Sequence, residues 1–331
     1  QAVLRDVVES TFIVSPTGSV NMPKALDGRS VAIGHSVYRM GIGGLHSSEQ
    51  VQAMVSDESY VLIDRDVTSY YPAIILNCNL SPLHLTRENA FLRVYRQIVE
   101  RRVEAKRIGD DVTASVLKIT ANGSFGKLGS KYSALYSPHL MVQVTITGQL
   151  ALLMLIERLE RRGFRVVSGN TDGIVIHCLR SREQDLLAVI QWWEKATGFN
   201  TEETRYRGVF SRDVNNYVAL KEKGGTKGKG AFASVSISKN PQNQVCVDAV
   251  LELLENGTPV EKTIRACRDI RKFVTVRTVR GGAVQVLQTR YDDTLTPGKK
   301  RDVLLAAGWY QTHKGPLKTA LFTYTTGEPD F

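Results

Sequence analysis

The sequence predicts an α+β fold in which helices and strands are not arranged as repeating βαβ units. Three observations support this prediction. A β-prone run at residues 60–63 leads into an acidic cluster, two helical patterns joined by a turn follow before residue 122, and two further β-prone runs flank a tight turn between residues 164 and 178. We therefore expect a tight hairpin between the last two runs.

The first two of these patterns predict a strand and a helical hairpin. Residues 60–63 are apolar and run directly into Asp64, Arg65 and Asp66, so Asp66 is expected at the end of a buried strand. Residues 87–107 are helical in pattern and strongly basic. A turn and N-cap at residues 109–111 then precede a second helix that is expected to run through residue 122.

The third helix and the strand hairpin follow. Residues 142–162 are amphipathic to apolar and stop at Gly163, which suits a left-handed helix cap. The runs FRVV and IVIHC flank SGNTDG, which has the composition of a tight hairpin turn. Beyond residue 181 we expect a helix that carries Trp192 and Trp193, then a Lys- and Gly-rich loop, and then helices at residues 245–255 and 260–272.

Composition limits the class of protein. The 331 residues are 42% hydrophobic, which is enough for one large core or two modest ones. The sequence shows no apolar run that we expect to cross a bilayer and no secretory layout, so the expected location is intracellular and cytoplasmic. Four separated cysteines and six scattered histidines predict neither a zinc site nor a disulfide framework.

The net charge suits a polyanionic partner. It is +10, with an isoelectric point near 9.4, and neutralised phosphates release counterions when a basic protein binds nucleic acid. A solvated surface of lysines and arginines gives the same total. Charge alone therefore favours nucleic acid only modestly.

Two aspartates have the placement that two-metal phosphoryl transfer requires. This chemistry needs at least two carboxylates that bridge a pair of divalent cations about 3.5–4 Å apart. Asp66 at a strand end and Asp172 in a hairpin turn meet this requirement if their strands are neighbours. Taken singly, each aspartate is an ordinary turn residue, and Asp172 followed by Gly173 is a common hairpin signal.

Three segments carry a family resemblance. DVTSYYPAII, which begins at Asp66, resembles the first polymerase motif of the family B DNA polymerases. KITANGSFG, which begins at Lys118, resembles the second, and SGNTDG at residues 168–173 resembles the third. The matching residues are Asp66, Ser69, Tyr71, Pro72, Ile74, Ile75, Lys118, Asn122, Phe125, Gly126, Thr171 and Asp172, whereas Ser168, Asn170 and Gly173 depart from the third motif.

The resemblance covers residues 38–229 and implies a phage-like polymerase core. Such a right-hand polymerase has an antiparallel palm sheet, a short helical fingers hairpin and a mostly helical thumb. The implied division is 1–58 for an N-terminal segment with a template-binding loop, 59–83 and 126–232 for the palm, 84–125 for the fingers and 233–331 for the thumb. The assignment of the thumb rests on position in the sequence alone.

The resemblance also assigns nucleotide contacts. Arg102 and Lys106 lie four residues apart on one helix face, and with Lys118 they are expected to contact a triphosphate. Ser69, Tyr71 and Asn122 complete the nucleotide site, with Tyr71 excluding a 2′-hydroxyl. The alternative is a solvated helix face and ordinary packing, and the solvated face is the preferred interpretation for Arg93, Arg96, Arg101 and Arg107.

DNA contacts are implied at two further places. The loop GIGGLHSSE, with Gly43 and Gly44, resembles the loop that lets a template strand approach the backbone in protein-primed phage polymerases, and a plain β-turn is an equal alternative. Tyr217 resembles a primer-holding tyrosine, although Asn215 stands where the family has a lysine. The expected DNA-binding residues are Gly43, Gly44, Phe125, Gly126, Thr171, Tyr217, Lys227 and Lys229.

The expected function is template-directed addition of dNTPs to a primer 3′ end, in DNA replication. Asp66, Asp172 and the Val67 carbonyl would hold two Mg²⁺ ions, for which Mn²⁺ can substitute. The partners are primer–template DNA and dNTPs, with no membrane, and the protein is expected to be a monomer. Only 65 residues precede Asp66, so we expect no proofreading exonuclease.

Three rival functions stay open. A catalytically impaired paralogue that only binds nucleic acid is motivated by Asn170, which stands where the third motif has a carboxylate. A primase-like polymerase and a non-enzymatic basic module are the other two. The Asn170 side chain can offer an oxygen to a metal or a bound water, but it lacks the charge of a carboxylate. We therefore expect Mg²⁺ to bind more weakly than it would with a full set of carboxylates, and Asn170→Asp to lower the metal requirement.

Overall fold

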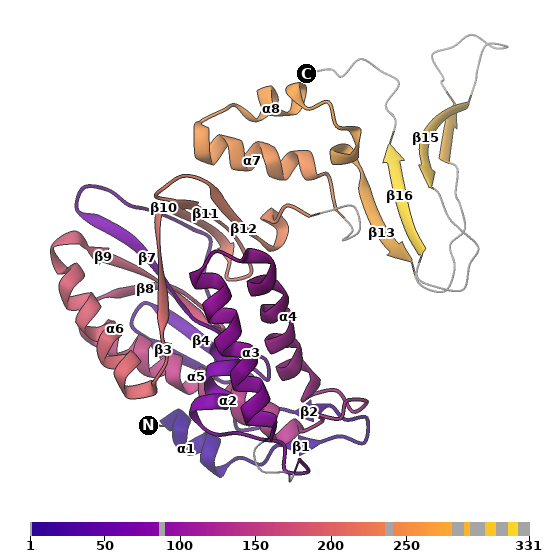
Figure 1. Ribbon diagram of the computed structural model, residues 1–331. Coiled ribbons are helices and arrows are strands. Elements are labelled where there is room, and N and C mark those ends of the chain that lie inside the picture. Colours follow the sequence, from indigo (N-terminus) through magenta and orange to yellow (C-terminus); the bar gives the residue numbers. More distant parts are fainter. Residues whose placement is uncertain are drawn as a thin grey trace. The chain divides into compact units, whose positions relative to one another are not determined.

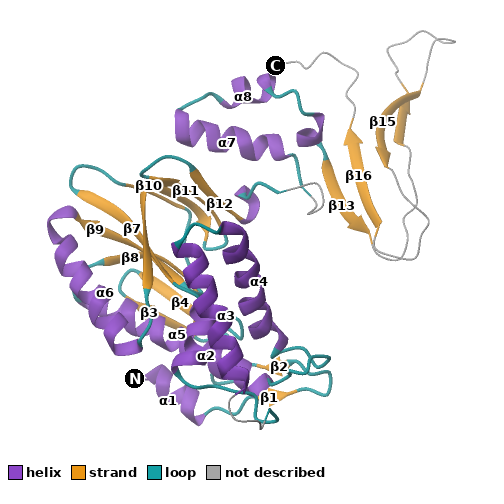
Figure 2. Ribbon diagram, viewed as in Figure 1, coloured by secondary structure: helices purple, strands orange, loops and turns teal. Residues whose placement is uncertain are grey.

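The computed structural model describes residues 2–85, 90–235, 241–279, 288–291, 302–308 and 317–323. The chain divides into two compact units, Gln1–Lys223 and Gly224–Phe331. Helices and strands occur in both (Figures 1 and 2). The α+β prediction is confirmed.

An antiparallel sheet forms the frame of the first unit. Its strand order is β11-β10-β7-β9-β8-β5-β4-β3, and β6 pairs with the second half of β10. The central strand β7 lies between β10 and β9, so both of its edges are hydrogen-bonded. The bounds are β3 Ser30–Ile33, β4 Ser36–Met40, β5 Leu45–Ser47, β6 Gln52–Val55, β7 Tyr60–Val67, β8 Arg165–Asn170, β9 Gly173–Leu179, β10 Thr201–Asp213 and β11 Asn216–Lys221.

The helices of this unit follow the predicted order. Helices α3 and α4 form the expected basic hairpin, in which the Tyr95 hydroxyl donates to the Ala121 carbonyl at 2.9 Å (Figure 1). Asp110 caps α4 by accepting from the Thr113 N–H at 3.0 Å. The bounds are α1 Ala2–Glu9, α2 Tyr70–Asn77, α3 Ala90–Arg107, α4 Asp111–Lys127, α5 Pro138–Arg161 and α6 Glu183–Thr197, with a short ribbon of β1 Ile13–Val14 and β2 Val20–Asn21.

Two helices are longer than predicted, and one cap is confirmed. Helix α4 continues to Lys127 because its last turn packs Phe125 against Tyr71, a tertiary contact that local pattern does not show. Helix α5 begins at Pro138, and proline suits a first helical turn. Gly163 has φ +78°, the left-handed conformation predicted for it.

The two faces of β7 have different surroundings. Val61 and Ile63 lie in the large core that also contains α5 and α6 side chains. Leu62 belongs to a smaller cluster on the opposite face, with Val167, Tyr206, Val209 and Ala219. Because side chains alternate along a strand, Asp64 and Asp66 share the face of Leu62. The two aspartates therefore lie on the face of β7 opposite to α5 and α6.

Helix α5 corrects one expectation. It has 24 residues and a window of mean hydropathy 1.7, so by length and composition alone it is able to cross a membrane. The prediction that no run has this property is wrong. In the structure 61% of that window is buried, and Leu152, Leu155 and Ile156 pack in the main core. A helix surrounded by protein is apolar on most sides, which gives it this composition.

The second unit contains both helices and strands. Its bounds are β12 Thr226–Lys229, α7 Gln244–Asn256, α8 Val260–Ala266, a 3₁₀ turn Ile270–Phe273, β13 Thr275–Val279, β14 Gln288–Tyr291, β15 Asp302–Gly308 and β16 Leu317–Thr323. The last four strands form an antiparallel sheet in the order β13-β16-β15-β14. The expectation of a mostly helical segment at residues 233–331 is therefore wrong for the described part. Alternating Val and Thr in VTVRTV favour a strand instead.

Two smaller predictions also fail in this region. The Lys- and Gly-rich segment contains strands β11 and β12, because residues 217–220 are Tyr, Val, Ala and Leu and pair with β10. The helix expected over residues 260–272 ends at Ala266, and Cys267 is extended, with ψ 122°.

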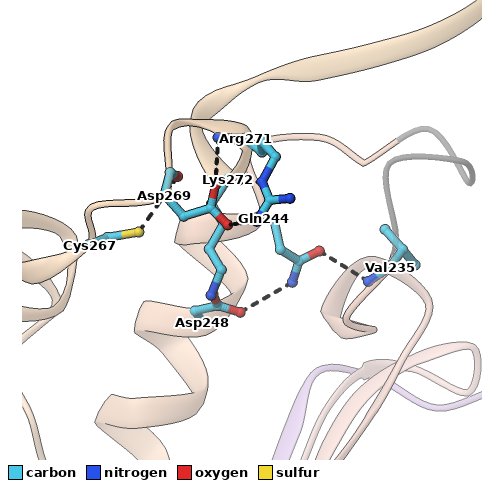
Figure 3. A network of polar contacts seen from close by, with 7 residues as sticks. All are labelled: Val235, Gln244, Asp248, Cys267, Asp269, Arg271 and Lys272. Atoms are coloured by element: carbon cyan, nitrogen blue, oxygen red, sulfur yellow. Dashed lines mark hydrogen bonds and ion pairs between the residues drawn. The ribbon is translucent and has the colours of Figure 1, made fainter.

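A polar network fixes the 3₁₀ turn of the second unit to α7 (Figure 3). Lys272 Nζ donates to Asp248 Oδ2 at 2.6 Å, and Gln244 Nε2 donates to Asp248 Oδ1 at 3.3 Å. The Val235 N–H donates to Gln244 Oε1 at 3.2 Å. The hydrogen bond from Lys272 to Asp248 raises the pKa of the lysine. These contacts hold the 3₁₀ turn and Val235 against α7.

Candidate active site

The two motif aspartates lie at one end of neighbouring strands. Strand β7 pairs with β9, and Asp66 is the direct cross-strand partner of Gly173. Asp172 occupies the turn between β8 and β9 and is exposed. Its carbonyl accepts from the Val67 N–H at 2.7 Å, which fixes the turn against the end of β7. The condition stated for two-metal chemistry, that the two strands be neighbours, is met.

Gly173 leaves space for the Asp66 carboxylate. A Cβ added at residue 173 would lie 2.1 Å from Asp66 Oδ1, so the carboxylate lies directly over the glycine backbone. Asp172 precedes this glycine. The structure therefore brings the side chain of Asp66 beside the hairpin tip that carries Asp172.

The glycine loop at residues 41–44 packs on the same hairpin. The Thr171 N–H donates to the Leu45 carbonyl at 2.8 Å, and Thr171 is left-handed, with φ +56°. A Cβ at Gly44 would lie 2.9 Å from Thr171 Oγ1, so this close approach favours glycine. Gly43 is exposed, and its carbonyl accepts a hydrogen bond from the Tyr71 hydroxyl.

Tyr71 links this loop to the helical hairpin. Its ring lies 4.2 Å from that of Phe125 on α4, measured between centroids. Burial, together with the negative charge of Asp172, raises the pKa of Tyr71 to about 12. Tyr70 feels the same charge, and burial is the main cause of its raised pKa. The charge of Asp172 therefore acts on both tyrosines that open α2.

Two cations of α3 reach the residues beside Asp66. An Arg102 guanidinium nitrogen donates to the Ser69 hydroxyl, and Ser69 caps α2 in a left-handed conformation, with φ +50°. Lys106 Nζ lies 2.6 Å from Glu202 Oε1, and Glu202 is the β10 partner of Asp66. The hydrogen bond from Lys106 lowers the pKa of Glu202. Arg102 Nε is buried and has no hydrogen-bond partner among the described residues.

The other predicted residues are distributed more widely. Lys118, Asn122 and Gly126 are exposed on α4. Tyr217 is half-buried on β11 and packs against the small cluster on the aspartate face. Lys227 and Lys229 are half-buried on β12 and belong to the second unit.

Sequence reasoning missed two carboxylates near Asp66. Asp64 is 4% exposed, and its Oδ2 accepts from the Tyr206 hydroxyl at 2.6 Å. Its position two residues before Asp66 on a strand was a usable signal, because such residues share a face. Glu202 gave no signal, because its pairing with β7 joins segments far apart in the sequence.

The donor set suits cations that are shared with a substrate. Asp66 and Asp172 supply carboxylate oxygens, the ligands that Mg²⁺ prefers. Within the described parts of the chain, no group of three or more His, Cys, Asp or Glu is arranged to hold a metal ion. Mg²⁺ is commonly bound by one or two carboxylates together with substrate phosphates, so two carboxylates at one strand end fit this mode.

Comparison with known proteins points to one family. Residues 93–198 match the model of DNA polymerase family B. DNA polymerase 1 of Aeropyrum pernix is 29% identical over 171 residues, which cover 50% of this chain and 18% of that protein. The DNA polymerase alpha catalytic subunit of Xenopus laevis is 33% identical over 97 residues, 26% of this chain and 7% of that subunit.

Two archaeal proteins extend the comparison. DNA polymerase 2 of Saccharolobus solfataricus is 23% identical over 223 residues, 63% of this chain and 34% of that protein. The structure of the family B DNA polymerase from Pyrobaculum calidifontis aligns with a TM-score of 0.47 and 16% identity, over 85% of this chain and 42% of that one. The matched parts of the chain thus span less than half of the length of each of these relatives. These matches show that residues 93–198 of this chain are similar to DNA polymerase family B.

Proposed function

We propose that this chain is a template-directed DNA polymerase that adds dNTPs to a primer 3′ end. The observation that carries the proposal is the pairing of β7 with β9, which sets Asp66 beside the hairpin tip of Asp172. Two α3 cations contact the residues next to this pair. Carboxylates facing cations at one strand end suit the transfer of a nucleotidyl group from a triphosphate.

The proposed metal ligands are Asp66, Asp172 and the Val67 carbonyl. When bound, two Mg²⁺ ions would activate the primer hydroxyl and neutralise the charge that develops on the leaving phosphate. The chain holds its carboxylates in place through the Val67–Asp172 backbone hydrogen bond and the space over Gly173.

The proposed nucleotide site lies between α3, α4 and the start of α2. Among the described residues, Arg102 Nε is buried without a hydrogen-bond partner, and Lys106 pairs with the exposed carboxylate of Glu202. A triphosphate would give both cations stronger acceptors. Tyr71 is fixed by Phe125 and by the Gly43 carbonyl, which supports its proposed role beside the nucleotide sugar. Lys118 and Asn122 on α4 complete the proposed site.

The proposal extends to the architecture. We propose that the sheet is the palm, that the α3–α4 hairpin is the fingers, and that residues 233–331 are the thumb. The hairpin and the antiparallel sheet support the first two assignments. The third rests on position in the sequence. A phage origin and a monomeric state also remain predictions.

A primer-extension assay with a labelled DNA primer, Mg²⁺ and either dNTPs or NTPs tests the function. Asp66→Ala and Asp172→Ala should each abolish extension, because each removes a carboxylate shared by both metals, while a gel-shift assay still shows primer–template binding. Asp27→Ala, which changes an exposed aspartate far from the motifs in sequence, is the control. Clear residual extension by both motif variants at saturating Mg²⁺ would overturn the assignment.

A further inference from the structure

The side chain of Asn170 joins two parts of the sheet that are not neighbours. It ends β8, whereas the residue that it contacts, Val214, follows β10. In the sheet, strands β7 and β9 separate β10 from β8. Asn170 Nδ2 nevertheless donates to the Val214 carbonyl at 3.0 Å. The end of β10 therefore approaches the hairpin tip across the face that carries the aspartates.

The course of β10 explains this approach. Its first half, residues 201–206, pairs with β7, and its second half, residues 208–211, pairs with β6. Register shifts occur at residues 206–208 and 211–213 of its pairing with β11, and such irregularities bend a strand. Tyr206 and Val209, on either side of the first irregularity, both belong to the small cluster on the aspartate face. The turn at residues 213–216 therefore lies within hydrogen-bonding distance of the end of β8.

The surrounding bonds fix which way the Asn170 amide points. The Thr171 hydroxyl donates to Asn170 Oδ1 at 3.1 Å, which leaves the nitrogen for the Val214 carbonyl. A carbonyl oxygen accepts hydrogen bonds and cannot donate them, so residue 170 must supply a donor. An ionised aspartate has no donor to offer. This requirement accounts for an asparagine where the third family motif has a carboxylate.

A second link runs parallel to the first. Glu49 accepts from the Ser47 hydroxyl at 2.8 Å and from the Ser211 hydroxyl at 2.7 Å. Ser47 belongs to β5 and Ser211 to β10, so this carboxylate also links two strands that are not neighbours in the sheet. The turn itself is ordered by Asp213, whose Oδ1 accepts from the Asn215 N–H at 2.9 Å. Tyr217 follows directly.

We propose that Asn170 is a positioning residue that holds the β10–β11 turn, and with it Tyr217, beside the β8–β9 hairpin that carries Asp172. The inference rests on the proposed polymerase function, in which Tyr217 contacts the primer terminus. Asn170 then acts through the turn and not through a metal. The earlier expectation was that the Asn170 oxygen faces a metal and that Asn170→Asp lowers the metal requirement. It is replaced by the expectation that Asn170→Asp leaves the Mg²⁺ requirement unchanged.

The test compares Asn170→Asp and Asn170→Ala with the unaltered chain. Primer extension gives the KM for primer–template, the KM for dNTP and the Mg²⁺ concentration at half-maximal rate. Both variants should raise the KM for primer–template by about two- to tenfold, the effect of losing one ordinary hydrogen bond, and leave the KM for dNTP unchanged. Gln191→Glu and Gln191→Ala, at an exposed position of α6, are matched controls.

Hydrogen exchange of the protein without DNA or metal supplies a readout that does not depend on activity. Amide exchange over residues 214–217 should be faster in both Asn170 variants and unchanged in both Gln191 variants. Thr171→Val, which removes only the bond that orients the amide, should have a smaller effect.

Two outcomes would overturn the inference. One is a lower Mg²⁺ requirement in Asn170→Asp together with a higher one in Asn170→Ala, which marks a metal-facing oxygen. The other is unchanged exchange in the turn. An unaltered chain that does not extend primers would instead refute the proposed polymerase, and the exchange result would still decide whether Asn170 holds the turn.

Discussion

The ion pair between Lys106 and Glu202 permits a prediction with opposite effects at its two ends. If Lys106 contacts the triphosphate, nucleotide binding must first break its bond to Glu202. Lys106→Ala should therefore weaken dNTP binding, whereas Glu202→Gln should strengthen it by releasing the lysine. A lysine on a solvated helix face predicts no change in either variant.

The structure sets the size of both effects. The two side chains are 53% and 50% exposed, and an exposed ion pair contributes about 0.2–1 kcal/mol. Release of Lys106 should therefore lower the KM for dNTP by about 1.4- to 5-fold, because about 1.4 kcal/mol corresponds to a tenfold change. Loss of a charge-assisted phosphate contact is worth about 1.5–3 kcal/mol, so Lys106→Ala should raise that KM by roughly tenfold or more.

Steady-state primer extension over a dNTP series measures both effects. Mg²⁺ is kept saturating, because Glu202 is the cross-strand partner of Asp66 and its charge also acts on the proposed metal site. The gain in Glu202→Gln should shrink as salt is added, since salt screens exposed charges. The melting temperature of either variant should fall by no more than about 4 °C. A KM for dNTP that is unchanged in Lys106→Ala would refute the contact with the triphosphate.

Two further predictions concern the nucleotide site. Tyr71→Ala should raise ribonucleotide incorporation, because it opens space beside the sugar, and an unchanged ratio of dNTP to NTP incorporation would show that Tyr71 only packs on Phe125. Arg102→Ala and Lys118→Ala should each raise the KM for dNTP or lower kcat by about tenfold, while Arg93→Ala, an exposed arginine of the same hairpin, should change little. Equal small effects at all three positions would indicate a diffuse basic surface.

Local pattern predicted the elements that carry the motifs. The apolar run before Asp66, the capped α4 and the hairpin at residues 165–179 all depend on residues close in sequence, and each lies where it was expected. The same is true of the glycine that ends α5. Periodicity and capping act over one or two turns of chain, so these features can be read without tertiary information.

Contacts between distant segments were not predictable in this way. Neither the Lys106–Glu202 ion pair nor the bond from Asn170 to Val214 has a local pattern, because each depends on where β10 lies in the sheet. The C-terminal strands were missed for a different reason. The expectation of a helical thumb came from family resemblance and sequence position, and no strand was predicted for the β-prone run VTVRTV at residues 274–279.

The departure at Asn170 bears on whether the chain has lost activity. A paralogue that has lost catalysis no longer needs its metal carboxylates, yet Asp66 and Asp172 are both present at one strand end. The asparagine, by contrast, has a bond that only a donor can make, so the missing charge is explained by the Val214 carbonyl. Replacement of a carboxylate is evidence for lost catalysis only when the substitute has no other role. Because Asn170 has one, the substitution gives no support to the impaired paralogue over the polymerase.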